Sequence, residues 1–474
     1  MTAKAERQIY LLSPRELSPE TIAVTFAKTS RSPHSFREIA EKLTDEKSAD
    51  FHEKWVVGYG HASVAEHAML HLAFENISRL AIECIESNRL ASYTEKSTRY
   101  QKWEPGGYQV PDEVVGTPHE VIYRETCDLL FDEYQRSLGE VRRVVQSLHP
   151  RREDESESRW DGRIRSRYVD VCRFLLPASA LANVGMTINA RSLEHALGKM
   201  FSHPLAEVRQ IGEAAKRVVQ QEVPTLVKYA DRRKHLVESR QESRRLARGL
   251  SSDGEQTMLA LVSSDSDAEL RVLAAALYEH EPCSFETALA HVRALDDTGR
   301  SALVEALLGS MDKFDAPTRA LEHAVYTVDG LMDQGAYFEV KRHRMMTQTA
   351  QRLTADLGYA VPRLITASGV EPSYRAAMHA AAQAYTELAK WNEEVAAYVV
   401  PNGFNRRVLL TFNLREAFHF CELRSAENAH FSVRRIALRL AELIREAHPT
   451  LAGRMRMPEG ITWQSIEAEN FSQV

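Results

Sequence analysis

Apolar residues recur at spacings of three and four along several long segments, a pattern typical of amphipathic helices. These segments contain few glycines and span residues 119–148, 205–229, 372–398 and 432–447. Shorter runs around residues 71–74 and 324–328 are rich in apolar and β-branched residues, which predicts strands with alternate residues buried. The pattern therefore indicates an α+β protein that is mainly helical.

Four landmarks of the first half of the chain recur in the same order in the second half. The pairs are Glu66-His67 and Glu322-His323, Arg89 and Arg344, the Gly-Tyr-x-Val-Pro runs at 107–111 and 358–362, and the segments 187–195 and 411–419. The first copy needs extra residues between Tyr100 and Arg173, for which the charged run 151–163 is a candidate. We interpret this order as a tandem duplication, with domains at 1–245 and 255–474. The charged segment 231–254 between them is expected to be a solvated helix end and linker.

Length and composition limit the class of protein. A chain of 474 residues exceeds one ordinary hydrophobic core. The formal net charge of -6 argues against binding of nucleic acid by bulk electrostatics. The first residues lack the apolar core of a signal peptide, and no stretch approaches the roughly 20 apolar residues of a membrane helix. Five cysteines are scattered without a CxxC pair, which favours reduced thiols. We therefore expect a soluble cytoplasmic protein.

Two arginine motifs are the main chemical candidates. The second copy contains Arg342-His343-Arg344, and the first contains Arg89 followed by Ser97-Thr98-Arg99-Tyr100. Guanidinium groups remain charged at neutral pH and pair with phosphate oxygens through two parallel hydrogen bonds. Each motif alone fits a solvated basic surface equally well. Glu66, His67 and His71 lack the HExxH order of a zinc site, so no metal site is expected.

Taken together, the motifs closely resemble the flavin-dependent thymidylate synthases. That family's signature is Arg-His-Arg, then seven residues, then Ser, usually continuing Ser-x-Arg-Tyr. The resemblance rests on residues 60–67, 88–100, 173–177, 187–193 and 413–431, and it covers most of both copies. It implies two domains, each mainly helical with a small antiparallel sheet. It also implies an FAD enzyme that methylates dUMP to dTMP with methylenetetrahydrofolate and NADPH, as a homotetramer with sites where subunits meet.

The departures from the family pattern are complementary between the copies. The first copy has Ser87-Asn88-Arg89 in place of Arg-His-Arg, but it keeps Ser-x-Arg-Tyr. The second copy keeps Arg-His-Arg but reads Arg352-Leu353-Thr354-Ala355 at the other motif. Two further family arginines survive once each: Arg173 stands opposite Ala397, and Arg424 opposite Met200. This pattern predicts a composite site shared by two degenerate copies, and a homodimer that forms a pseudo-tetramer.

The resemblance assigns roles residue by residue. For substrate binding it implies Glu95, Ser97, Arg99, Arg173 and Arg424. For catalysis it implies Arg99, Arg424 and His61. For the flavin it implies Ser63, Arg89, Asn189, His195, Arg342, His343, Arg344, Asn413 and His419. Competing interpretations are a polar helix cap at residues 61–63 and core histidines at His195 and His419.

Three classes of function remain open from the sequence. The first is a working flavin-dependent thymidylate synthase. The second is a related flavin enzyme with a changed pyrimidine substrate or one-carbon chemistry, which the incomplete Arg-His-Arg of the first copy favours. The third is a non-catalytic flavin- or nucleotide-binding paralogue. Bound flavin would distinguish the enzymes from a scaffold without cofactor.

Overall fold

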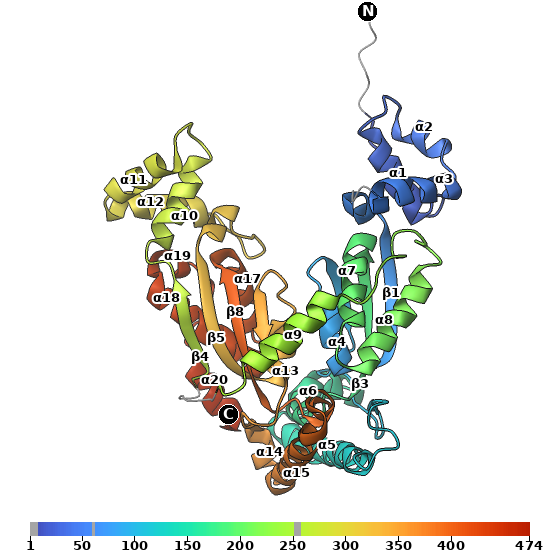
Figure 1. The fold of residues 1–474 in the computed structure, drawn as a ribbon. Helices are drawn as coiled ribbons and strands as arrows, with labels where there is room; N and C mark the ends of the chain where they lie inside the picture. Colours follow the sequence, from blue (N-terminus) through green and yellow to red (C-terminus); the bar gives the residue numbers. More distant parts are fainter. Residues whose placement is uncertain (1–7, 59–61, 251–256) are drawn as a thin grey trace, which may run out of the picture. The chain divides into compact units, whose positions relative to one another are not determined.

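A computed structural model describes residues 8–58, 62–250 and 257–474 of the chain (Figure 1). Internal contacts divide it into two compact units. Unit 1 comprises residues 1–96, 111–113 and 181–251, and unit 2 comprises residues 97–110, 114–180 and 252–474. Most of the segment between residues 97 and 180, which belongs to the first copy by sequence, therefore packs with the second copy. The boundaries 1–245 and 255–474 remain a prediction about the repeats.

Unit 1 is built on a three-stranded antiparallel sheet in the order β1-β3-β2. Its strands are β1 (Met69–Ser78), β2 (Ala91–Glu95) and β3 (Leu181–Asn189). Its helices are α1 (Pro19–Thr29), α2 (Phe36–Glu41), α3 (Asp45–Phe51), the π-helix η1 (His52–Gly58), the 3-10 helix η2 (Ala62–His67), α4 (Arg79–Glu86), α7 (Ala190–Phe201), α8 (Ala206–Val219) and α9 (Lys234–Leu246).

Unit 2 is built on a four-stranded antiparallel sheet in the order β4-β5-β8-β6, with a separate two-stranded pair β7-β9. Its strands are β4 (Leu259–Ser264), β5 (Val325–Asp333), β6 (Thr347–Ala350), β7 (Val361–Pro362), β8 (Asn405–Asn413) and β9 (Phe471–Gln473). Its helices up to β5 are α5 (Glu120–Leu148), α6 (Glu157–Cys172), η3 (Arg173–Leu175), α10 (Ala268–Tyr278), α11 (Phe285–Ala294), α12 (Asp297–Leu308) and η4 (Arg319–His323). Those after β5 are α13 (Gln334–Val340), α14 (Arg363–Ala367), α15 (Glu371–Trp391), α16 (Glu393–Ala396), η5 (Ala397–Val399), α17 (Leu414–Ser425), α18 (Phe431–Ala447), α19 (Pro449–Ala452) and α20 (Trp463–Asn470).

The two sheets share the same strand register at the repeated motifs. Met69 pairs with Asn189 in unit 1, and Val325 pairs with Asn413 in unit 2. In both units the central strand then leads directly into a helix, α7 or α17. The strand β1 likewise leads into α4, and β5 leads into α13. The α+β class predicted from the hydrophobic pattern is confirmed, and the two units repeat one arrangement.

Equivalent segments of the two copies meet within unit 2. Pro177 and Pro401 form an antiparallel bridge. On either side of it, the Ala178 amide donates to the Val400 carbonyl and the Asn402 amide donates to the Leu176 carbonyl, both at 3.0 Å. The helices α5 and α15, which precede these segments, also pack together (Figure 1). Because equivalent segments of the two copies contact each other, this contact has local two-fold symmetry of the kind seen in homodimers.

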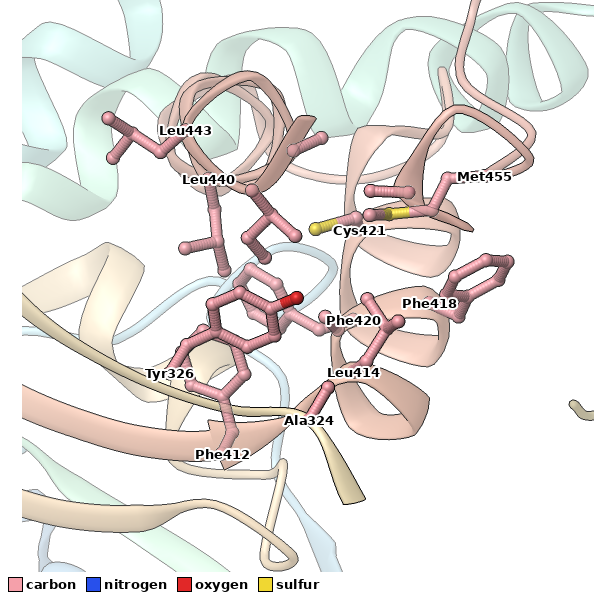
Figure 2. Packing of buried hydrophobic residues seen from close by; sticks show 14 of the residues in the cluster. Ala324, Tyr326, Phe412, Leu414, Phe418, Phe420, Cys421, Leu440, Leu443 and Met455 are labelled. Carbon is pink, nitrogen blue, oxygen red and sulfur yellow. The ribbon is translucent and has the colours of Figure 1, made fainter. Parts of the chain in front are cut away.

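A hydrophobic cluster fixes the helices of unit 2 that follow the sheet. The rings of Tyr326 on β5 and Phe412 on β8 stack with centroids 6.0 Å apart (Figure 2). Phe420 of α17 and Leu440 of α18 are fully buried in the same cluster. Each fully buried side chain of this size contributes about 1.5–3 kcal/mol of transfer free energy. The polar residues of α17 therefore project from a rigid support.

The helices expected at 119–148 and 432–447 are confirmed as α5 and α18, and the two short strands lie within β1 and β5. The prediction for 205–229 was wrong beyond Val219, where a turn leads to Pro224. The helix predicted over 372–398 is interrupted at Asn392, where α15 ends. The Asn392 side chain caps the next helix, α16, by accepting hydrogen bonds from the Glu394 and Val395 amides. Short polar side chains compete with the helix backbone in this way.

The two charged segments contain helices. The run 151–163 becomes helical at Glu157, and Arg163 pairs with Glu155 at 2.8 Å. The segment 231–254 contributes α9, in which no residue is buried, in agreement with a solvated helix. Across the described ranges, every helix is too short or too polar to cross a bilayer.

Candidate active site

Three of the predicted substrate-binding arginines meet in unit 2. Arg99 lies in a turn, Arg173 begins η3 at the end of α6, and Arg424 lies in the last turn of α17. Glu339 of α13 connects Arg173 and Arg424. Its Oε2 is 2.6 Å from Nη1 of Arg424, and its Oε1 is 3.9 Å from Nη1 of Arg173. We call Arg99, Arg173, Arg424 and Glu339 the arginine cluster.

A buried N-cap positions α13 and hence Glu339. The Asp333 carboxylate accepts a hydrogen bond from the Ala336 amide at 2.8 Å and another from the Ser432 hydroxyl. Gly335 follows two residues after Asp333, and a Cβ there would lie 3.0 Å from Asp333 Oδ1 and 3.5 Å from Arg173 Nη2. The absence of a side chain at this position lets the guanidinium lie against the first turn of α13.

Arg99 is held by a bidentate ion pair. Its Nε and Nη2 donate to the two carboxylate oxygens of Asp170 at 2.9 to 3.1 Å. Its Nη1 donates to the Asn428 carbonyl at 3.0 Å, so the first and second copies are linked here. The Arg99 side chain is 15% exposed, so it is not completely enclosed by the protein.

Arg173 is almost completely enclosed, with 2% of its side chain exposed. Its Nη1 donates to the Thr98 hydroxyl at 3.3 Å, and its Nη2 donates to the Gly335 carbonyl at 3.2 Å. The Nε–H has no hydrogen-bond acceptor among the residues that the structure describes. A buried donor without an acceptor is rare in proteins, and it leaves this N–H able to bind a ligand oxygen.

Arg424 connects the cluster to His343 of the Arg-His-Arg motif. The Arg424 Nε donates to Nε2 of His343 at 3.0 Å. Because that nitrogen accepts, the proton of the neutral ring is on Nδ1, which donates to Glu416 at 3.0 Å. The Phe420 ring lies edge-on to His343 at 4.8 Å. His343 is buried, and its two ring nitrogens connect Glu416 to Arg424 of the arginine cluster.

Burial and charge act in opposite directions on these groups. Burial raises the pKa of Glu339, but the surrounding guanidinium groups lower it by a larger amount, so the net pKa lies below its usual value. These groups belong to Arg173, Arg342, Arg424 and Arg99. Burial lowers the pKa of Arg424, partly offset by Glu339. Arginine nevertheless remains charged at neutral pH. The cluster therefore consists of several buried positive charges around Glu339, with the Asp170 carboxylate paired to Arg99 beside them.

Burial also lowers the pKa of His343, although the hydrogen bond to Glu416 opposes this change. The ring is therefore neutral at neutral pH, in agreement with its acceptor role toward Arg424. A neutral imidazole with a fixed tautomer can orient a guanidinium without adding a further positive charge to the cluster.

Sequence reasoning did not single out four residues that hold the site. Asp170, Thr98, Glu339 and His430 were not assigned roles. His430 is fully buried, accepts from the Ser432 amide through Nδ1 and donates from Nε2 to the Asp170 carbonyl at 3.2 Å. The signal available for Glu339 was one carboxylate in the apolar segment just before Arg342.

Two predicted substrate residues make local contacts. The Glu95 carboxylate pairs with Arg79 at 3.0 Å inside unit 1, where both side chains are 2% exposed. The Ser97 hydroxyl accepts a hydrogen bond from the Arg99 amide at 3.2 Å and so shapes the turn that carries Arg99. Their roles in substrate binding remain predictions.

Unit 1 contains two cavities lined by predicted flavin residues. One, of about 990 Å³, is lined by Arg89, His195 and Ser192 among others. The second, of about 690 Å³, is lined by Ser63 together with aromatic residues such as Trp55. Glu66, which is paired with Arg191, lines both cavities. His61 lies outside the described residues.

The remaining predicted flavin residues occupy equivalent positions in the two units. Asn189 caps α7 and Asn413 caps α17, each accepting from the amide three residues later at 2.8 and 2.9 Å. His195 and His419 are both exposed, so the interpretation as core histidines was wrong for both.

The Arg-His-Arg motif divides between surface and interior. Arg342 is exposed, Arg344 is half-buried and His343 between them is buried. The two arginine side chains are therefore accessible to a large cofactor, whereas the histidine side chain is not. Near the start of β1, the His71 Nδ1 lies 2.8 Å from the Thr187 hydroxyl. Within 8–58, 62–250 and 257–474 no group of three metal-ligating side chains converges.

Comparison with known proteins gives a family match in both halves of the chain. A family model described as thymidylate synthase complementing protein matches residues 13–225 and again residues 260–450. A protein of Chlamydia muridarum described as "UPF0159 protein" is 31% identical over 435 residues, covering 87% of this chain and 82% of the relative. A Thermoplasma acidophilum protein with the same description is 28% identical over 447 residues, covering 86% of this chain and 88% of the relative.

Shorter relatives match about half of the chain. A flavin-dependent thymidylate synthase of Clostridium tetani is 25% identical over 218 residues, which is 45% of this chain and 82% of that enzyme. A protein with this name therefore corresponds in length to one copy. The long relatives, by contrast, span both copies.

Proposed function

Because the chain belongs to the thymidylate synthase complementing protein family, we propose that it methylates dUMP to dTMP at a site shared by its two copies. The proposed co-substrates are methylenetetrahydrofolate and NADPH, and the proposed cofactor is FAD. One observation carries the proposal. Arg99 and Arg173 of the first copy and Arg424 of the second meet around two buried carboxylates, Asp170 and Glu339, although they lie far apart in the sequence.

The cluster suits a nucleotide monophosphate. Arginine pairs bidentately with phosphate oxygens, and such charge-assisted hydrogen bonds are about twice as strong as neutral ones. Arg173 supplies a buried Nε–H with no acceptor in the described structure, and Arg99 and Arg424 each keep 15% of their side chains exposed. We assign these three arginines to the phosphate, and Arg99 and Arg424 also to the orientation of the reacting pyrimidine.

The residues around the larger cavity of unit 1 fit a flavin nucleotide. Arg89 can pair with a phosphate, and His195 and Ser192 can donate to polar ring edges. In unit 2 we assign the equivalent His419 together with Asn413, Arg342, His343 and Arg344. When bound, FAD would supply the redox chemistry, while the protein binds and orients its partners. Ser63, Asn189 and the undescribed His61 complete the proposed set.

His343 and Glu416 hold Arg424 in place for this role. The Nδ1–H of His343 donates to Glu416, which leaves Nε2 free to accept from Arg424. Loss of this chain would allow the guanidinium to rotate away from the phosphate position. Small misplacements of a positioning group lower turnover strongly, because the reactants must be held in a reactive geometry.

The chain is proposed to act as a homodimer that resembles the tetramer implied by the family resemblance. The two copies already meet with local two-fold symmetry at Pro177 and Pro401. A second function, a one-carbon transfer to a different pyrimidine nucleotide, is favoured by Asn88. This residue stands where Arg-His-Arg has its histidine, and its side chain donates to the Ile85 carbonyl at 2.9 Å.

The test uses purified protein, dUMP labelled with tritium at C5, methylenetetrahydrofolate and NADPH. We expect bound flavin in the visible spectrum and release of tritium, because methylation replaces the hydrogen at C5. Flavin without tritium release from dUMP, but with turnover of another pyrimidine nucleotide, would favour the second function. Protein with neither flavin nor turnover after incubation with FAD would contradict both.

A further inference from the structure

Glu339 occupies the position in the arginine cluster at which an anion would be held most strongly. Its two oxygens contact different arginines, Arg173 at 3.9 Å and Arg424 at 2.6 Å. The first of these belongs to the first copy of the sequence and the second to the second copy. The Glu339 side chain is only 7% exposed. A single buried carboxylate therefore bridges the two halves of the proposed phosphate site.

The neighbouring charges explain why a carboxylate is needed there. Transferring guanidinium groups from water into a protein interior is unfavourable unless counterions accompany them. Arg99 has its own partner in Asp170. Arg173 donates hydrogen bonds to neutral groups only, and the carboxylates of Asp170 and Glu339 both stabilise its charge, Glu339 at 3.9 Å. Glu339 thus compensates Arg424 and shares the compensation of Arg173 with Asp170.

The equivalent position of the first copy lacks both charges. The helix α4 corresponds to α13, because Ser78 caps the first and Asp333 caps the second. Counting from these caps, Cys84 stands where the second copy has Glu339. Met200 stands where it has Arg424 and is fully buried. The carboxylate is present where the arginine is present and absent where the arginine is absent.

We propose that Glu339 is an internal counterion that takes the place of the ligand phosphate when no ligand is bound and must release Arg424 when a phosphate monoester binds. This inference rests on the proposed function, because that function places the nucleotide phosphate at these arginines. The ligand class is a phosphate monoester whose oxygens bind Arg424 and the unpaired Nε–H of Arg173. Glu339 then repels the incoming dianion, and this repulsion weakens binding of phosphate that lacks the rest of the nucleotide.

The main test replaces Glu339 by glutamine, which keeps the size and one carbonyl acceptor and removes the charge. Binding of inorganic phosphate and of dUMP is measured by equilibrium dialysis on the full-length protein. We expect Glu339→Gln to bind both about tenfold more tightly than the wild type, with the larger gain for inorganic phosphate. Equal or weaker binding of inorganic phosphate by a folded variant would overturn the inference.

A matched control removes a buried carboxylate of the same unit outside the cluster. Glu133 on α5 is 7% exposed and pairs with Arg136 at 2.6 Å. Glu133→Gln is expected to leave phosphate binding within about twofold of the wild type, because the Glu133 carboxylate binds Arg136, Ser137 and Ser373 rather than the arginines of the cluster. A gain equal to that of Glu339→Gln would show a general charge effect and would contradict a local counterion.

A thermal measurement serves if Glu339→Gln is only marginally folded. Removing one partner of a buried pair leaves the other charges uncompensated. A ligand that binds only the folded state raises the melting temperature. We therefore expect phosphate to raise the melting temperature of Glu339→Gln more than that of the wild type. An equal or smaller rise would overturn the counterion role, whereas tritium release from dUMP tests the proposed function separately.

Discussion

The two units place different chemistry on the same frame of strands and capped helices. In unit 2, Arg424 of α17 forms an ion pair with Glu339 of α13 at 2.6 Å. In unit 1 the equivalent positions hold Met200, which is fully buried, and Cys84, for which burial raises the thiol pKa to about 11. The apolar version shows that the frame does not need the charges in order to pack.

The contrast bears on why unit 2 keeps buried charges that unit 1 lacks. Replacing a buried ion pair by apolar residues of similar volume is often neutral or stabilising, by about 1–4 kcal/mol. Unit 1 has the uncharged residues Met200 and Cys84 at these positions, whereas unit 2 has the ion pair of Arg424 and Glu339. A charged cluster that persists where its apolar equivalent is viable supports the proposal that these charges bind a ligand. The following changes probe this contrast.

The largest effect on stability is expected at the ion pair of unit 1. Glu95→Ala leaves the buried Arg79 without its carboxylate, so we expect the free energy of unfolding to fall by about 3–5 kcal/mol in urea titrations. The double variant Arg79→Met, Glu95→Met should lose less, because no charge is left unpaired. A loss below about 1 kcal/mol for Glu95→Ala would contradict a structural pair. Normal dUMP affinity of the folded fraction would remove the proposed substrate role of Glu95.

A large effect on nucleotide binding is expected when unit 2 is made to resemble unit 1. Arg424→Met introduces the residue of the equivalent position and leaves Glu339 without its closest arginine. We expect dUMP affinity and turnover to fall about 100-fold, since breaking a buried hydrogen-bonded charge pair costs about 2–5 kcal/mol. Leu423→Met changes an exposed neighbour and should leave both unchanged. Near-normal affinity in Arg424→Met would place the phosphate elsewhere.

Acid should destabilise unit 2 through His430. Burial lowers the pKa of His430 well below its ordinary value, with further lowering by Arg173 and Arg99. A folded-state pKa below the unfolded one means that the unfolded chain binds the proton first as the pH falls. The stabilisation is thus complete above about pH 6.5 and declines below it, by up to about 1.4 kcal/mol for each pH unit.

This pH effect is measured by urea unfolding at pH 7 and pH 5.5. His430→Asn keeps a side chain that can cap α18 but removes the titrating ring, so its stability should fall less than that of the wild type between the two pH values. Equal losses for both proteins would show that His430 is not the group that takes up the proton.

The smallest effects are expected at the two equivalent caps. Asn189→Ala and Asn413→Ala should each lower the free energy of unfolding by about 1 kcal/mol, because each removes a side-chain bond to an amide of the first helical turn. Aspartate keeps this bond, so Asn413→Asp should retain the stability. If flavin affinity is normal in both alanine variants, the assignment of these asparagines to the flavin is wrong and they act as caps only.

Much of the fold could be predicted because its signals are local. The helix α5 follows from apolar spacing, and the paired registers of Asn189 and Asn413 follow from a repeated motif. The end of α8 and the break at Asn392 were missed, because a single capping side chain or turn outweighs the periodicity of the surrounding residues.

The site was predictable only in part. The three arginines could be found because each belongs to a motif. Glu339, Asp170 and His430 could not, since their importance depends on which distant groups they face. Asp170 pairs with a residue 71 positions away, and His430 donates to a carbonyl 260 positions away. The first pair lies within one copy and the second joins the two copies, and both follow from tertiary packing that no local pattern encodes.

We infer that one phosphate site is assembled from both copies within a single chain, and co-expression of two defective variants tests this assembly. Arg99→Ala and Arg424→Met chains carrying different tags are purified together, and dUMP binding is measured. The arginine cluster lies wholly inside unit 2, so we predict that the mixed protein binds no better than either variant alone. Recovery of about one site with wild-type affinity for each mixed dimer would show that the two arginines act across chains, which would contradict this account.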